Sequence, residues 1–311
     1  MNEHSVEPGR EPECLTVHEV AAYLRINERK VYELVREGSL PATKAAGKWL
    51  FPRRLIEEWL LESTHGGVLA DRLLVAGSDD PLLASALAFL AADVGDSALV
   101  AVSPTGTRRG LELLSRRRAN VCGIHWGSAE ESDAQHWRLV RAYVGHAGWT
   151  LVRMARREQG VMLSPRAARR AHLEALATPD LRWVLRQPGA GSQHFLRSTF
   201  HDRGLDLDAL TVADTALTER HAASLIVQDR ADCAPGVRSA AAEFGLQFLP
   251  LGWESFDLVL PQSVYFRRLF QGLLALIGSE RGRGIAAALQ GYDLSPLGQL
   301  VTDTASDFPP S

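Results

Sequence analysis

Cysteine is scarce in this sequence, which has three in a chain of 311 residues: Cys14, Cys122 and Cys233. Because they are odd in number and widely separated, they provide neither the close pairs of a zinc site nor a framework of disulfides. The scarcity excludes the small disulfide-rich secreted folds and indicates a reducing compartment.

Long apolar runs and a leader sequence are also absent. Residues 269–277 form an apolar stretch that is too short to span a bilayer. The first residues, 1–4, lack the basic segment and following apolar segment of a secretory signal. We therefore expect a soluble cytoplasmic protein without a membrane partner.

A strong charge of either sign is missing too, because 34 basic and 37 acidic residues leave a net charge of −3. A protein with this balance does not coat polyanions, so any contact with nucleic acid must be local. The length of 311 residues and the hydrophobic fraction of 46% predict two or three domains with large cores.

What the sequence does contain, in residues 15–61, is the pattern of a winged helix-turn-helix. Thr16 and Glu19 form a capping box, which predicts the start of a first helix. Asn27 closes a three-residue turn and is a good N-cap for a second helix over residues 28–37. Two short helices joined in this way are typical of DNA-binding modules, in which the second helix enters the major groove.

A hairpin and a closing helix complete the module. Gly38 is expected to supply the left-handed residue that ends the second helix. Residues 41–51 predict a hairpin with Ala46 and Gly47 at its tip, and residues 53–61 predict a third helix.

The order and spacing of these segments resemble the excisionase-type, MerR-related winged helix family. The pattern K-x-x-G-K-W-L-F-P-R followed by I-x-x-W, in residues 44–59, carries most of the resemblance. It implies DNA binding through the turn, the second helix and the hairpin. The expected DNA contacts are Arg25, Asn27, Arg29, Lys30, Tyr32, Arg36, Lys44, Lys48 and Trp49.

After this module, strands alternate with helices. Strands are expected over residues 68–76, 98–103 and 121–124, and helices over residues 82–92 and 109–117. The alternation favours an α/β fold with a parallel sheet. A second block continues it, with strands expected at 151–155, 181–185, 231–234, 246–251 and 256–260, and helices at 166–176, 194–203, 216–228, 237–244, 264–277 and 284–290.

This part of the chain is similar to the PBP-like substrate-binding domain found with excisionase-type modules or with molybdopterin-synthesis enzymes. The strongest matches are RWVLRQPGAGSQHFL, ADCAPGVRSAAAEFGLQFLPL and ESFDLVLP, and the weaker ones are AGSDDPLL, SPTGTRRGLELL and VCGIHW. The resemblance implies the two α/β lobes of a periplasmic molybdate- or tungstate-binding protein, of the type II-like kind, with a ligand between them.

The expected domains follow from these two resemblances. The winged helix-turn-helix takes residues 12–62, a linker takes 63–68, and the PBP-like domain takes 69–295. Residues 302–311 are expected to form a disordered tail. The chain crosses twice between two lobes, lobe I (69–150 and 255–295) and lobe II (156–250).

Small polar residues at turns between strands and helices predict the ligand site. Ser78, Thr105 and Ser192 each lie at such a turn, where exposed N–H groups and the helix dipole favour an oxyanion. The resemblance makes molybdate or tungstate the default ligand and adds His221. The expected ligand contacts are Ser78, Asp79, Ser103, Thr105, Gly106, Gly191, Ser192, Gln193 and His221.

Two departures from the family pattern leave other ligands open. Residues 189–193 read Gly-Ala-Gly-Ser-Gln where the family has Gly-Ser-Gly-Thr-Arg, so a hydroxyl and a cation are lost. Asp79 stands where the family has histidine, and its negative charge disfavours a dianion. An uncharged or cationic ligand, or a cleft that has lost its ligand, stays open beside the oxyanion.

The two resemblances together imply a one-component transcriptional regulator, which binds operator DNA as a homo-oligomer such as a dimer and senses a small molecule. No histidine has metal-ligand spacing and no nucleophile–base pair is visible, so we expect no enzymatic activity, no metal and no cofactor. The alternative is an enzyme or a cytoplasmic small-molecule carrier of molybdenum-cofactor metabolism, whose N-terminal module makes protein contacts.

Overall fold

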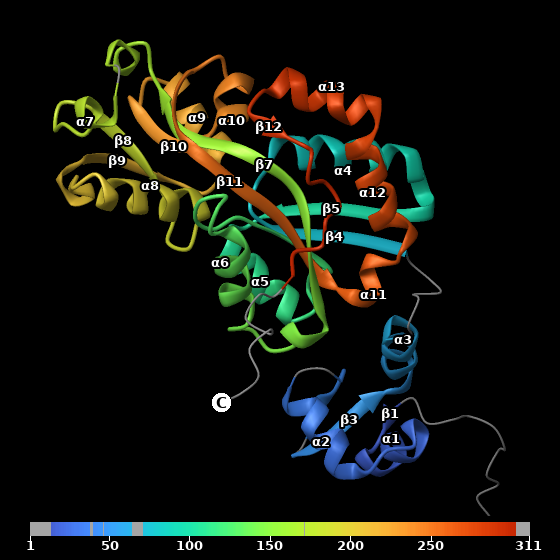
Figure 1. Ribbon diagram of the computed structural model, residues 1–311. Coiled ribbons are helices and arrows are strands. Elements are labelled where there is room, and N and C mark those ends of the chain that lie inside the picture. The colour runs from blue at the N-terminus through green and yellow to red at the C-terminus, as the bar shows by residue number, and fades with distance from the viewer. Residues whose placement is uncertain (1–13, 38–39, 46, 64–70, 171, 303–311) are drawn as a thin grey trace, which may run out of the picture. The chain divides into compact units, whose positions relative to one another are not determined.

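The computed structural model describes residues 14–37, 40–45, 47–63, 71–170 and 172–302. The chain divides into two compact units, Met1–Asp71 and Arg72–Ser311 (Figure 1). The features expected at Gly38 and Ala46, in residues 64–68 of the linker and in residues 303–311 of the tail lie outside the described residues.

The first unit is a small winged helix with a three-stranded sheet of order β1-β3-β2. Both predicted caps are present: Glu19 N donates to Thr16 Oγ1 at 3.3 Å, and Lys30 N donates to Asn27 Oδ1 at 2.8 Å. The elements are β1 (Cys14–Leu15), α1 (Val17–Leu24), α2 (Glu28–Arg36), β2 (Thr43–Ala45), β3 (Lys48–Pro52) and α3 (Arg53–Ser63).

The predicted turn, second helix, hairpin and closing helix of this unit are all present, and one strand is added. β1 pairs antiparallel with β3 and sets Leu15 opposite Phe51. A strand of two residues has no periodicity that a sequence pattern could reveal. The core is closed by the buried side chains of Leu15, Val20, Ala21, Val31, Leu40, Phe51 and Ile56.

The second unit contains the α/β elements, which run as follows in chain order: β4 (Asp71–Gly77), α4 (Pro81–Val94), β5 (Ala98–Pro104), α5 (Thr107–Ser115), β6 (Val121–Ile124), α6 (Ser132–Val140), β7 (Trp149–Leu163), α7 (Leu173–Leu176), β8 (Arg182–Arg186), α8 (Gly191–Asp202), β9 (Thr211–Ala216), α9 (Glu219–Val227), β10 (Cys233–Val237), α10 (Arg238–Glu243), β11 (Gln247–Pro261), α11 (Gln262–Tyr265), α12 (Arg268–Gly278), α13 (Glu280–Leu289) and β12 (Tyr292–Asp293).

Two long strands, β7 and β11, organise this unit as a two-lobed fold. The sheet order is β5-β4-β6-β11-β7-β10-β8-β9, with β12 also paired to β7. β7 and β11 run side by side along their whole length, as Figure 1 shows in light green and orange. They separate β4, β5 and β6 on one side from β8, β9 and β10 on the other.

The expectation of a parallel sheet is wrong for the centre of this sheet. β4 pairs parallel with β6, and β8 pairs parallel with β9 and β10. β7 and β11 instead pair antiparallel with each other and with their neighbours β10 and β6. The chain crosses between the two halves once in each direction, so the two crossing strands run in opposite senses.

Several other elements differ from expectation. The strands expected at 246–251 and 256–260 form one strand, β11, which continues through Gly252 by means of register shifts. The helix expected over 166–176 is interrupted at Arg170, whose backbone is extended with φ −103° and ψ 123°. The elements α6, β9 and β12 were not expected, because short segments rich in polar residues carry little periodicity.

Hydrophobic cores lie on both sides of the crossing strands. Leu82 of α4, Leu273 of α12 and Ala286 of α13 belong to one core, and Trp183 of β8 packs with Phe200 of α8 in another. Each half therefore has its own packed interior, as a two-lobed domain requires. Among the described residues, no helix is long and apolar enough to cross a bilayer.

Candidate functional site

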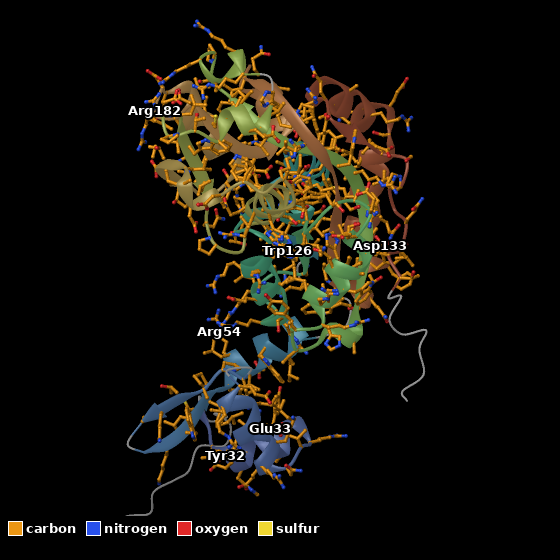
Figure 2. The ribbon with its side chains drawn as sticks, turned by 60° about the vertical axis from the view of Figure 1, so that its left-hand side comes forward. Tyr32, Glu33, Arg54, Trp126, Asp133 and Arg182 are labelled. Carbon is orange, nitrogen blue, oxygen red and sulfur yellow. The ribbon has the colours of Figure 1, made fainter. Side chains whose placement is uncertain are left out.

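The side chains expected to contact DNA lie on the surface of the first unit. Figure 2 marks Tyr32 and Glu33 on α2. A groove open to solvent, with about 910 Å³ of unoccupied space, is lined by Glu28, Arg29, Tyr32, Val35, Arg36 and Trp49. The structure thus brings four of the expected residues together, Arg29, Tyr32, Arg36 and Trp49, while Lys30, Lys44 and Lys48 are exposed outside this lining.

Local contacts give the other expected residues different roles. Lys30 Nζ lies 3.0 Å from Glu33 Oε1, and Lys44 Nζ lies 5.7 Å from the centre of the Trp49 ring. Arg25 has the left-handed conformation, with φ 55°, that ends α1. The groove combines guanidinium groups, which bind phosphate oxygens, with aromatic rings that can pack against sugars and bases.

A narrow cleft lies between the two halves of the second unit, with about 190 Å³ of unoccupied space including open solvent. Both halves contribute to it at the C-terminal ends of their parallel strands, which is where α/β proteins usually bind ligands. The lining residues are Ser78, Asp79, Gly106 and His125 from one half and Arg186, Ala190, Gly191 and Glu219 from the other.

One corner of the cleft is suited to an anion. α5 begins after Gly106 and α8 begins after Ala190, and neither helix receives a side-chain cap from the residues that the structure describes. Arg186 is 7% exposed, and burial lowers the pKa of its guanidinium, which still stays charged at neutral pH. Two polarised helix N-termini and one arginine favour a bound oxyanion or carboxylate.

Hydrogen bonds hold the Arg186 guanidinium in place. It donates to Ser192 Oγ at 3.1 Å and to the carbonyl oxygens of Ala216 and Leu217 at 3.2 and 3.0 Å. Its backbone N donates to Gln193 Oε1 at 2.9 Å. Ser192 and Gln193, which were expected to contact the ligand, lie outside the lining and instead position the arginine that lines the cleft.

The other expected ligand contacts divide into two groups. Ser78, Asp79, Gly106 and Gly191 line the cleft. Thr105 Oγ1 accepts a hydrogen bond from Gly77 N at 3.2 Å and holds the turn. Ser103 and His221 are exposed and lie outside the lining, and His221 Nδ1 accepts from Leu217 N at 3.3 Å.

Two carboxylates face the same cleft. Burial raises the pKa of Asp79, although Arg220 opposes the rise. Glu219 is 2% exposed, and its Oε1 lies 3.7 Å from Arg186 Nη1. Its other oxygen, Oε2, has no hydrogen-bond partner among the described residues. No group of three or more histidine, cysteine or carboxylate side chains in the described ranges could hold a metal ion.

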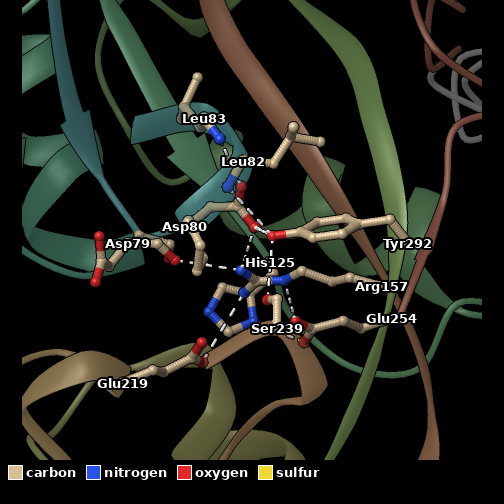
Figure 3. A network of polar contacts seen from close by, with 12 residues as sticks. Asp79, Asp80, Leu82, Leu83, His125, Arg157, Glu219, Ser239, Glu254 and Tyr292 are labelled. Atoms are coloured by element: carbon tan, nitrogen blue, oxygen red, sulfur yellow. Dashed lines mark hydrogen bonds and ion pairs between the residues drawn. The ribbon is translucent and has the colours of Figure 1, made fainter. Parts of the chain in front are cut away.

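A buried network of charges lies beside the cleft on the crossing strands (Figure 3). Arg157 of β7 donates from Nε to Glu254 Oε1 of β11 at 2.6 Å and from Nη1 to Asp80 Oδ2 at 3.0 Å. His125 Nδ1 lies 2.6 Å from Glu254 Oε2. Tyr292 of β12, which the strand register sets opposite Arg157, donates to Asp80 Oδ2 at 2.8 Å.

Acid is expected to destabilise the second unit through this network. Burial alone favours the neutral acid, but His125 and Arg157 lower the pKa of Glu254 to about 2 from the ordinary 4.5. A carboxylate with a lowered pKa stabilises the folded chain above its unfolded pKa and loses this effect as the pH falls. We expect Glu254 to account for a loss of about 3 kcal/mol in the free energy of unfolding between about pH 5 and pH 2.

Thermal unfolding at several pH values in this range measures the effect. Glu254→Gln should show a shallower fall in melting temperature than the wild type. A residual slope is expected in both proteins, because His136 and Arg153 lower the pKa of Asp257 despite its burial. Parallel profiles would rule out Glu254 as the titrating group.

The two sides of the cleft touch at Gly191. A Cβ atom at this position would lie 2.3 Å from the carbonyl oxygen of His125. Close by, the rings of Trp126 and His194 stack with centroids 4.4 Å apart. Since backbone cannot move aside as a flexible side chain can, only glycine permits this approach.

Gly191→Ala is therefore expected to hold the cleft open. Overpacking of this kind costs at least about 1 kcal/mol, so a ligand of the closed cleft should bind at least about fivefold more weakly. Small-angle scattering should show a larger radius of gyration. Gly284→Ala is the matched control, because Gly284 is exposed on α13 and no atom of the described part of the chain lies within 4 Å of an added Cβ. Equal scattering from both variants would contradict the contact.

Sequence reasoning missed Arg186, Glu219 and the pair of Arg157 and Glu254. The cation sought at Gln193 comes from Arg186, seven residues earlier in the chain, at the end of a strand and not on the helix. Charged residues inside the expected strands could have indicated these positions, because a charge that is buried in a sheet requires a partner of opposite charge. The sequence did not tell which partner each charge has.

Comparisons with known proteins agree with the division into two units. Residues 14–64 match a helix-turn-helix domain, and residues 89–278 match a PBP superfamily domain. The chain is 19% identical over 319 residues to the uncharacterized protein YvgK of Bacillus subtilis (strain 168), which covers 94% of this chain and 99% of that protein.

Two solved structures resemble the second unit. One, from Clostridium perfringens, is assigned as a phosphate ABC transporter substrate-binding protein with bound phosphate; it has 12% identity and a TM-score of 0.51, and covers 72% of this chain and 100% of its own. The other is the tungstate ABC transporter from Geobacter sulfurreducens, with 14% identity and a TM-score of 0.49. The match covers 70% of this chain and 97% of that one. At 12% identity, the similarity to the Clostridium perfringens protein shows a shared fold and nothing about the ligand.

Proposed function

The chain belongs to the PBP superfamily and carries a helix-turn-helix domain, and from this premise we propose that it is a ligand-responsive transcriptional regulator. One observation carries the proposal: a helix-turn-helix with a groove lined by arginines occurs in the same chain as a charged cleft between two lobes. We propose that the protein works in the cytoplasm, on DNA, and without catalysing a reaction.

A gel-shift assay with the full-length protein and the DNA upstream of its own gene tests this function. We expect specific retardation that survives an excess of unrelated duplex and changes in strength when the cleft ligand is added. A lack of specific binding would favour the alternative, an enzyme or a carrier whose N-terminal unit makes protein contacts.

The first ligand class to test is an oxyanion, and molybdate and tungstate are its default members. The resemblance of residues 181–260 supports it, as does the corner formed by Arg186 and the N-termini of α5 and α8. Calorimetric titration with molybdate, tungstate and sulfate measures binding. Ser192→Ala should weaken it, because Ser192 Oγ accepts a hydrogen bond from the Arg186 guanidinium.

We propose that ligand binding closes the two lobes, lobe I (69–150 and 255–295) over lobe II (156–250). The hinge would lie in β7 and β11, where the register shifts between Pro250 and Gly252 and between Phe256 and Asp257. A ligand that contacts both lobes favours the closed state, because only a difference in affinity between two states can shift their populations.

The regulator is expected to bind its operator as a dimer. One α2 helix and one hairpin reach few base pairs, and two-fold pairing on adjacent half-sites supplies the missing affinity. Light scattering of the complex should give two chains per duplex. A single chain, both in free solution and on DNA, would count against this arrangement.

A further inference from the structure

The buried oxygen of Glu219 is the feature of the cleft that its protein contacts leave unexplained. Glu219 is 2% exposed and lines the cleft, yet its Oε2 has no hydrogen-bond partner among the described residues. Leaving a carboxylate oxygen buried without a donor is costly, so native proteins usually satisfy such an atom with a ligand, an ion or water. A donor group of a ligand would complete this site.

The charge of the lining points to the same kind of ligand. Apart from His125, which is paired with Glu254, the lining carries the guanidinium of Arg186 and the carboxylates of Asp79 and Glu219. Two carboxylates against one cation repel a dianion. The anion-binding corner is nevertheless present, because three of the five N–H groups of Arg186 donate to protein and two stay available within the described residues.

We propose that the natural ligand is a small zwitterion of the amino-acid type, an inference that rests on the proposed ligand-sensing function. Its carboxylate binds Arg186 and the N-termini of α5 and α8, and its ammonium group donates to Glu219 Oε2. In this conformation the cleft has about 190 Å³ of non-atom space, open solvent included, and no volume that a single water molecule can occupy. The ligand is therefore small, and the lobes must part to admit it.

Glu219 also links such a ligand to the crossing strands. Its Oε1 lies 3.4 Å from Gln159 Nε2 and 3.9 Å from Arg157 Nη2, both on β7 (Figure 3 shows Glu219 and Arg157). Arg157 Nη2 is itself without a hydrogen-bond partner among the described residues. An ammonium group bound to Oε2 adds a positive charge beside Glu219 and Arg157. Because Arg157 lies on β7, one of the two strands of the proposed hinge, the ligand can thereby act on the closure of the lobes.

The first experiment compares ligands on the wild-type full-length protein. Each proteinogenic amino acid is tested by thermal shift, and the best is then titrated by calorimetry beside its α-hydroxy acid and its deaminated acid. Because loss of one partner of a buried charged hydrogen bond is costly, the amino acid should bind at least about 30-fold more tightly than the deaminated acid. Equal affinities would overturn the proposal.

The second experiment uses Glu219→Gln, which keeps the shape and removes the charge. The amino acid should bind at least about 30-fold more weakly, and molybdate should bind more tightly than to the wild type. Glu174→Gln, at an exposed position of α7, is the matched control and should change neither affinity. If Glu219→Gln keeps the wild-type ratio of affinities for the amino acid and molybdate, the role of Glu219 is overturned. The comparison of ligands on the wild type stands even if this variant does not fold.

The outcomes separate this inference from the proposed function. Binding of molybdate but of no amino acid to the wild type would overturn the zwitterion and leave the ligand-responsive regulator intact. Binding of neither would overturn both. Loss of specific DNA binding in the gel-shift assay, with an amino acid bound in the cleft, would overturn the regulator and leave the ligand class standing.

Discussion

Replacing Arg29 and Lys48 together by glutamate is expected to weaken operator binding by at least about 100-fold, since each such contact contributes about 1–3 kcal/mol and reversal adds repulsion. Arg29 lies in the groove on α2, and Lys48 is exposed on β3. In a winged helix-turn-helix, the second helix (here α2) and the hairpin (here β2 and β3) obtain their affinity for DNA from contacts with phosphates and base edges. Fluorescence anisotropy with labelled operator at fixed salt measures the change.

The control for this double variant reverses the same number of charges on the other unit. Arg116 and Arg118 are exposed just after α5, so Arg116→Glu with Arg118→Glu gives the same change in net charge. Operator affinity of the control should stay near the wild-type value. Thermal unfolding of the larger unit should be the same in both variants, and wild-type affinity in the first would rule out the assigned DNA-binding face.

Arg157→Met is expected to destabilise the second unit by about 3–5 kcal/mol, because it leaves buried carboxylates without their cation. Arg157 is fully buried and bonds to Glu254 and Asp80. For a unit of this size the melting temperature should fall by roughly 10 °C. Differential scanning calorimetry at neutral pH measures the fall.

A neighbouring arginine provides the matched control for Arg157. Arg156 precedes it on β7 but is exposed, so Arg156→Met should change the melting temperature by only a degree or two. Adding Glu254→Leu to Arg157→Met should restore part of the lost stability, since it removes one unpaired charge. An equal effect of both single variants would show that the network does not depend on the buried guanidinium.

The winged helix could be predicted from sequence because its determinants are local. Thr16 with Glu19, and Asn27 with Lys30, are hydrogen-bonded partners three residues apart, so their spacing is visible in the chain. The alternation of strands and helices likewise indicated that Ser78, Gly106 and Gly191 lie at turns after strands. These three residues do line the cleft, whereas Arg186 and Glu219, which line it with them, were not identified from the sequence.

The charges of the cleft depended on the tertiary structure. Arg157 is paired with Glu254, 97 residues away, and with Asp80, 77 residues away. These partners meet because β7 and β11 cross between the lobes in one particular register, and no spacing along the chain encodes that register. The sequence by itself thus determined the two kinds of domain and the turns after strands that line the cleft. The tertiary structure decided which carboxylates are neutralised by a cation, and it left Glu219 Oε2 without a hydrogen-bond partner among the described residues.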